Sequence, residues 1–247
     1  MKPTARKIIM AVAACVFVFS GVMLLRHQLQ MRASAKCAET IAQTAIVFPT
    51  KDSPLDVFEN APFEVKFYVL FEQNEDIIAW IYAPNTPINY PIVQTSDNDY
   101  YLRRLLDGRY NFAGTLFMDY RNAADFSDWN SLIYGHNMKN ETMFGSLHHY
   151  KSQAYFDEHP YLYLFTAEQN YKIRVLAGFV TSSDAEVYNA FDADAEEQRA
   201  LIAGWMETSD FDSGLEVADG DRLITLSTCS YDYANARYVL VGILEDL

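Results

Sequence analysis

The chain has 247 residues, of which 50% are apolar and 15% aromatic, enough to bury the core of one ordinary domain or two small ones. The first 36 residues carry six basic residues and no acidic one, which leaves 13 basic against 33 acidic residues in the remainder. An acidic body of this kind repels phosphate backbones, so we expect no nucleic-acid partner. Ten glycines, eight prolines and three cysteines exclude collagen-like and disulfide-scaffold classes.

An uncharged apolar stretch, Ile8 to Leu25, follows the short basic start of the chain. As a helix it spans about 27 Å, near the lower limit for crossing a bilayer. A signal peptide cleaved at Ala33-Ser34-Ala35 is the alternative, but the stretch is longer than a signal core of about 7–15 residues. We therefore expect residues 1–7 as a cytoplasmic tail and 8–25 as a transmembrane signal anchor. Basic residues flank both ends of the stretch, so charge alone does not fix its orientation; translocation of the large body favours a body outside the cell.

The next elements are predicted from local composition and from the positions of prolines. Residues 31–44 favour a leading helix, which three prolines, Pro49, Pro54 and Pro62, then interrupt, so residues 26–62 are interpreted as a stalk with a leading helix. A further helix is predicted over Phe63 to Trp80. Seven short β-rich runs follow, Ile88–Val93, Gly114–Phe117, Ser131–Tyr134, Tyr161–Thr166, Tyr171–Thr181, Arg222–Thr228 and Arg237–Leu244.

Strands without alternating helices predict a mainly β domain, either an antiparallel sandwich or a closed barrel. Two helical segments interrupt them, Tyr100 to Leu106 and Asp194 to Met206, the second with acidic residues at its start and an apolar face. The second helix lies in an excursion of about 40 residues that precedes Arg222. Long insertions of this kind often form the walls of binding sites.

Cys229 ends one predicted strand and Arg237 begins the next. Alternation places Ser227 and Cys229 on the face opposite the apolar Leu226, so the thiol is expected to be accessible. Antiparallel pairing of the two strands would bring Cys229 beside Arg237, where a guanidinium favours thiolate and can bind an oxyanion. We expect a free thiol here, the alternative being a disulfide with Cys37.

One histidine differs from the other four. His136 follows a strand-like run, and Gly135 before it permits an unusual backbone angle. The others adjoin the apolar stretch (His27) or lie among polar residues (His148, His149, His159). A Cys and a His that meet in the fold form an activated-thiol site. Taken singly, a buried cysteine, a turn histidine and a surface arginine are ordinary features, and spacing does not decide between these interpretations.

These motifs resemble those of sortases, and of class B in particular. Thr225-Leu226-Ser227-Thr228-Cys229 matches the T-L-x-T-C signature, the family's Arg follows at Arg237, and its His stands in Tyr134-Gly135-His136. The resemblance runs from about Asp76 to the C-terminus, and the segments that carry it beyond the signature are 88–94, 97–102, 113–121 and 134–145.

The resemblance implies a membrane-anchored cysteine transpeptidase on a closed eight-stranded sortase-type β-barrel, with N-terminal helices and a helix in the long loop before the Cys strand. Residues 63–247 would be the catalytic domain. Such enzymes cleave a C-terminal sorting signal of a secreted protein after its Thr, hold the protein as a thioester, and pass it to an amine of a peptidoglycan precursor or of a pilin.

Residue by residue, the resemblance implies Cys229 as nucleophile, His136 as general acid and base, and Arg237 as the oxyanion or substrate clamp. Tyr134 and Ser227 match the family's substrate groove, although both would also serve as ordinary strand residues. Asn98 is a further substrate-binding candidate.

The remaining expectations concern ligands, partners and cellular location. The sequence has no group of residues with metal-ligand spacing and no Gly-rich phosphate loop, so neither a metal nor a cofactor is expected. The expected partners are secreted proteins with sorting signals, a wall amine acceptor, and the cell membrane of a Gram-positive type surface, with the catalytic domain outside. A pilin-polymerising sortase is one alternative, and a non-catalytic, membrane-tethered adhesive barrel is another.

Overall fold

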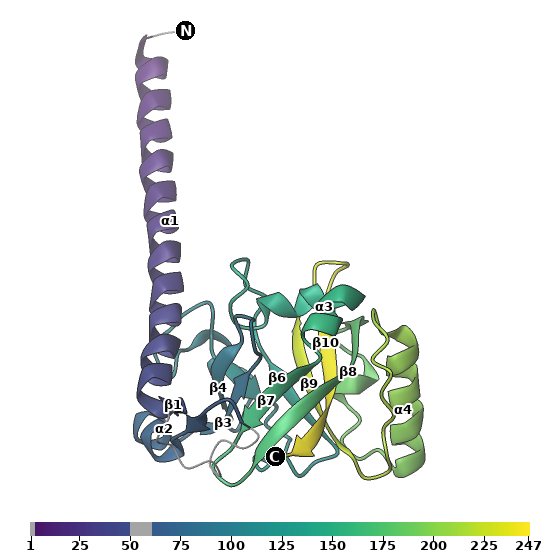
Figure 1. Ribbon diagram of the computed structural model, residues 1–247. Coiled ribbons are helices and arrows are strands. Elements are labelled where there is room, and N and C mark those ends of the chain that lie inside the picture. Colours follow the sequence, from purple (N-terminus) through teal and green to yellow (C-terminus); the bar gives the residue numbers. More distant parts are fainter. Residues whose placement is uncertain (1–2, 50–60) are drawn as a thin grey trace.

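The structure, a computed structural model, describes residues 3–49 and 61–247. Its body is a closed barrel in the strand order β10-β8-β7-β3-β4-β5-β6-β9, with β9 pairing with β10 to complete the ring (Figure 1). The strands are β3 (Ile77–Tyr82), β4 (Asn89–Val93), β5 (Leu116–Met118), β6 (Asn130–Tyr134), β7 (Tyr161–Phe165), β8 (Asn170–Ser182), β9 (Arg222–Cys229) and β10 (Ala236–Asp246). The closed eight-stranded barrel expected from the resemblance is confirmed.

The seven predicted β-rich runs all form strands, with ends that shift by up to two residues. The antiparallel expectation is wrong at two places, because β4 pairs with β5, and β6 with β9, in parallel. The second of these pairings matters for the site. Parallel strands end at the same edge of a sheet, so the residues that follow β6 and β9 emerge side by side.

The predicted helix over Phe63 to Trp80 is wrong. Only Phe67–Gln73 is helical (α2), and the end of the predicted segment lies in β3, a central barrel strand between β4 and β7. Asn74 ends the helix with an extended backbone, and its side chain donates to the Leu106 carbonyl at 2.8 Å. The run in β3 is apolar without alternation because the strand is buried on both faces, and such a run does not distinguish a strand from a helix.

The other short elements flank the barrel. Within Tyr100–Leu106 only a single 3₁₀ turn, η2 (Tyr101–Arg103), forms. The second predicted helix is confirmed as α4 (Ala195–Thr208), capped by the Asp194 carboxylate, which accepts from the Glu196 and Glu197 amides. The smaller elements are β1 (Ile46–Val47) paired with β2 (Glu64–Val65), η3 (Gly145–Lys151), α3 (Gln153–Glu158) and η4 (Glu186–Tyr188).

The N-terminal helix α1 (Pro3–Ala45) is continuous and rises away from the barrel (Figure 1). The leading helix predicted over residues 31–44 forms as part of α1, and the second half of α1 packs on the body. The His27 ring stacks on Phe112 at 4.6 Å between centroids, Asn111 donates to the Gln30 carbonyl at 2.8 Å, and Ala45 is fully buried. Of the three interrupting prolines, Pro54 lies outside the described residues.

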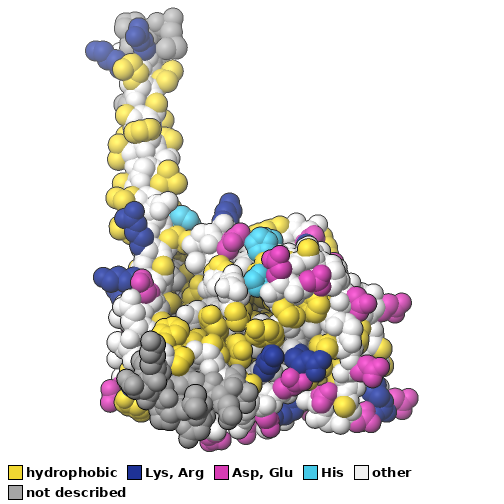
Figure 2. Space-filling view, in the orientation of Figure 1, with side chains coloured by type: hydrophobic (Ala, Val, Ile, Leu, Met, Phe, Trp, Pro, Cys, Tyr) yellow, Lys and Arg dark blue, Asp and Glu magenta, His cyan; other side chains and the backbone are white. Residues whose placement is uncertain are grey.

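The projecting half of α1 is apolar and exposed, with basic side chains near both ends (Figure 2). By length and composition this helix is suited to cross a membrane, and no residue of its most apolar window is buried. In water such a surface would be unfavourable, so the anchor predicted from the sequence remains our proposal for this segment.

The core explains why β9 ends in a site. Ile224 and Leu226 point into the barrel with the other buried aliphatic side chains. The opposite face of β9 is covered as well, because Thr225 and Ser227 are buried beneath the excursion that carries α4. Contrary to the sequence expectation, this face as a whole is not accessible, and only the end of the strand reaches a cavity.

Candidate active site

A cavity of about 370 Å³ opens where β6, β9 and β10 meet. All six residues singled out from the sequence line it, namely Asn98, Tyr134, His136, Ser227, Cys229 and Arg237. The further lining residues are Leu102, Thr115, Phe117, Arg121, Gly135, Ser183, Tyr188, Asn189 and Thr228. The fold therefore brings the imidazole of His136 to a thiol and a guanidinium that lie far from it in the sequence.

The thiol and the guanidinium lie on directly paired residues. Cys229 at the end of β9 pairs with Arg237 in β10, as the strand alternation predicts. Cys229 is half-buried and has a free thiol, as does Cys37, so the alternative disulfide does not form. The Asn137 amide donates to the Cys229 carbonyl at 2.7 Å, which ties the end of β9 to the loop after β6.

Among the described residues, only backbone oxygens hold the Arg237 guanidinium. Its Nη1 donates to the Ala236 carbonyl at 3.1 Å and to the Asn235 carbonyl at 3.5 Å. No carboxylate of the described residues lies within 4.0 Å of it. The positive charge is therefore not neutralised locally, and two of the three guanidinium nitrogens are available to a ligand in the cavity.

His136 reaches the same cavity from the residues just after β6. Its Nε2 donates to the Leu102 carbonyl at 2.7 Å, so in the neutral ring the lone pair is on Nδ1. Burial lowers the pKa of His136, the Leu102 carbonyl opposes this shift, and the Arg103 charge adds to it. The imidazole is thus neutral near pH 7 and able to accept a proton.

Gly135 places this histidine for a reason other than the expected one. It does not have a positive φ. A Cβ at this position would lie 2.4 Å from the Leu116 side chain and 2.6 Å from that of Phe144. The residue is small because β5 and the Phe144 ring approach its backbone closely.

A buried carboxylate, Asp119, organises one wall of the cavity. It accepts from Arg121 Nε at 2.9 Å, from the Tyr134 hydroxyl at 2.9 Å and from the Asn98 amide at 3.0 Å. Burial alone would raise the pKa of Asp119, but the hydrogen bonds, led by those from Arg121, outweigh it and lower the pKa. The expected groove residues Tyr134 and Asn98 are thus held by one charge that sequence reasoning missed, although Asp119 lies two residues after the predicted strand Gly114–Phe117.

The excursion before β9 supplies the other wall, as its length suggested. The Tyr188 hydroxyl shares a hydrogen bond of 2.8 Å with Ser227, and burial raises the pKa of Tyr188 to about 12. Arg121 donates to the Tyr188 carbonyl at 3.1 Å and lies over the Phe191 ring. No sequence signal marks Tyr188, because its role depends on where η4 folds back.

Comparison with known proteins decides the family. The protein-family model for the sortase domain matches residues 81–245. The chain belongs to the sortase family. The sortase is 32% identical to sortase B of Listeria monocytogenes over 92% of this chain and 91% of the relative, and 30% identical to sortase B of Staphylococcus aureus over 72% and 73%.

Solved structures agree with this assignment. Sortase B of B. anthracis in complex with AAEK1 is 30% identical, with a TM-score of 0.73 over 91% of this chain and 100% of that one. The Staphylococcus aureus sortase B–substrate complex is 28% identical, with a TM-score of 0.69 over 74% and 85%. The protein is therefore a class B sortase, a sortase-type cysteine transpeptidase.

Proposed function

We propose that this sortase cleaves the C-terminal sorting signal of secreted proteins and transfers them to an amine of the cell wall. His136 takes the thiol proton of Cys229, the thiolate attacks the carbonyl of the signal's Thr and forms a thioester, and His136 passes that proton to the departing amine. The acceptor amine then attacks the thioester and gives its proton to His136, which releases the thiol. The pairing of Cys229 with Arg237 beside a neutral His136, in one cavity, is the observation that supports this proposal.

Arg237 is proposed to bind the carbonyl oxygen of the Thr as it becomes an oxyanion. Its two remaining nitrogens carry N–H groups that no described carboxylate occupies, and donors fixed before the reaction stabilise developing charge. Tyr134, Ser227 and Asn98 are proposed to line the path of the signal peptide. Their hydrogen bonds to Asp119 and Tyr188 keep these side chains in place before the peptide binds.

The proposed place of action follows from α1. Its projecting apolar half would anchor the enzyme in the cell membrane as a single pass, with the barrel outside, where secreted proteins and wall precursors are present. Packing of the second half of α1 on the barrel would keep the cavity at a fixed position relative to the anchor.

The proposal is tested by supplying both substrates. Full-length enzyme in detergent micelles is incubated with a library of candidate signal peptides, each with one of two amines: triglycine as a wall-type acceptor, or a peptide lysine as a pilin-type acceptor. We expect cleavage after Thr and a joined product with triglycine, and neither with Cys229→Ala. A product with the lysine peptide alone would instead support the pilin-polymerising alternative, and cleavage of no peptide would support a non-catalytic barrel.

A further inference from the structure

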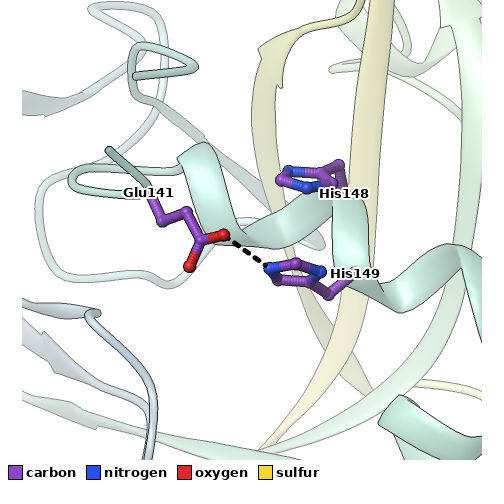
Figure 3. Close-up of side chains that lie close together, drawn as sticks. All are labelled: Glu141, His148 and His149. Atoms are coloured by element: carbon purple, nitrogen blue, oxygen red, sulfur yellow. Dashed lines mark hydrogen bonds and ion pairs between the residues drawn. The ribbon is translucent and has the colours of Figure 1, made fainter. Parts of the chain in front are cut away.

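Three ligand-type side chains meet on the surface beside η3, outside the catalytic cavity (Figure 3). They are Glu141, His148 and His149, and one ligand atom of each lies within 4.8 Å of the other two. Figure 3 shows the Glu141 carboxylate directed at the His149 ring, with the His148 ring alongside. We propose that these residues form a Zn²⁺ site, with water as the fourth ligand, that ties the loop after His136 to η3.

The distances suit a small tetrahedral ion. Zn²⁺ binds imidazole nitrogens at about 2.0–2.1 Å and carboxylate oxygens at about 2.0–2.2 Å, which places neighbouring ligand atoms about 3.3–3.5 Å apart. The His149 Nε2 and Glu141 Oε1 atoms are 3.2 Å apart. The His148 ligand atom lies within 4.8 Å of both, and the exposed Glu141 side chain can move toward it. Two imidazoles and one carboxylate favour Zn²⁺ over Ca²⁺ or Mg²⁺, which prefer six or more oxygen ligands.

The surroundings of His148 match those of a metal ligand. Its Nδ1 is hydrogen-bonded to the Gly145 carbonyl, which as an acceptor requires the proton to be on Nδ1. The Nε2 lone pair is then free to bind an ion. A ligating histidine usually donates its other ring N–H to a carbonyl or carboxylate in this way, which fixes both tautomer and ring orientation.

Glu141 is presented by a tight turn. Its own φ is +65°, and its amide donates to the Met138 carbonyl at 2.8 Å. The turn closes with the Phe144 amide donating to the His136 carbonyl at 3.1 Å. A Cβ on Gly145 would lie 2.4 Å from the Met138 carbonyl oxygen, so the turn is packed directly against the start of η3. The carboxylate is therefore held close to both histidines before any ion binds.

Such an ion would act on the catalytic side of the molecule. The loop that carries Glu141 begins at Asn137, whose side chain holds the Cys229 carbonyl, and it follows His136 directly. Bonds from one ion to Glu141 and to the two η3 histidines would restrain this loop from its outer side. The sequence does not indicate the site, because two adjacent histidines seven residues after a glutamate form no recognised ligand spacing.

The test measures Zn²⁺ binding by full-length protein in detergent micelles. A Cys229→Ala background removes the cavity thiol, because thiolates are zinc ligands. Within it, His148→Ala, His149→Ala and Glu141→Gln are compared with His159→Ala, which removes a nearby histidine outside the cluster that contacts Tyr155. Affinity comes from competition with a chromophoric chelator, and equal melting temperatures without zinc show that each variant folds.

We expect one zinc-dependent site in the background and in His159→Ala. Loss of an outer partner of a metal ligand costs about 10–100-fold in affinity, so loss of a direct ligand should cost at least about 100-fold. Co²⁺ bound there should give tetrahedral visible bands without the near-ultraviolet band of a thiolate ligand, and hydrogen exchange of residues 138–144 should slow. Equal affinity in all variants, or a cobalt–thiolate band, would overturn the site, and unchanged exchange on binding would overturn the restraint of the loop.

Discussion

Replacing Arg237 by lysine separates the geometry of this residue from its charge. One guanidinium nitrogen, Nη1, is engaged by the Ala236 carbonyl at 3.1 Å, which leaves Nε and Nη2 to face a substrate oxygen. An ammonium keeps the positive charge but not two oriented donors in one plane. Loss of a well-placed donor to an oxyanion costs about 2–4 kcal/mol. We therefore expect Arg237→Lys to reduce the rate of peptide cleavage about 30- to 1000-fold.

The assay pairs turnover with thiol reactivity. Cleavage of a quenched fluorescent signal peptide gives kcat/KM, and the rate of Cys229 alkylation by iodoacetamide reports the reactivity of the thiol. Arg199→Lys, on the outer face of α4 where Arg199 pairs with Asp219, is the matched control and should change neither. Near wild-type cleavage by Arg237→Lys would refute the oxyanion role. If alkylation of Arg237→Lys slowed by the same factor as cleavage, Arg237 would act on the thiol and not on the oxyanion.

Three further outcomes follow from the site. Asp119→Asn leaves Arg121 without its buried partner, so the free energy of unfolding in urea should fall by about 3 kcal/mol. This is the lower end of the range for a broken buried pair, because Arg121 is partly exposed. A loss no greater than in Asp219→Asn would contradict this expectation. Burial lowers the pKa of His136, so on acidification the unfolded chain binds a proton at this residue at a higher pH than the folded protein does. The free energy of unfolding should therefore fall as the pH drops from 6.5 toward the lower pKa of the folded protein. His136→Gln should remove this contribution to the pH dependence of the melting temperature. Tyr188→Phe takes away the hydrogen bond of Ser227 and should cost about 1 kcal/mol of stability and raise KM for the signal peptide; an unchanged KM would remove Tyr188 from the peptide path.

The sequence predicts the catalytic end of the barrel well because the relevant information is local. Alternation from Arg222 to Cys229 and the short connection to Arg237 fix which residues pair across two neighbouring strands. His136 could be singled out by its place after a strand, although the need for Gly135 before it is steric. That requirement depends on Leu116 and Phe144, which only the folded barrel brings to this backbone.

The sequence predictions fail where tertiary contacts determine the structure. The apolar run in β3 suits a helix or a strand equally, and its burial on both faces between β4 and β7 determines the outcome. The docking of α1 through His27 and Ala45 likewise depends on contacts with the folded body, which composition does not show. Asp119 was not a candidate because its importance lies in three partners that come from separate segments of the chain.

The central claim is that Cys229 carries the secreted protein as a thioester. The most direct measurement is mass analysis of full-length enzyme mixed with a cleavable signal peptide without an acceptor amine, quenched in acid before hydrolysis. The account predicts added mass equal to the peptide up to its Thr, located on Cys229, released by hydroxylamine and missing in Cys229→Ala. Cleavage of the same peptide without any adduct on Cys229, or an adduct on another residue, would contradict it.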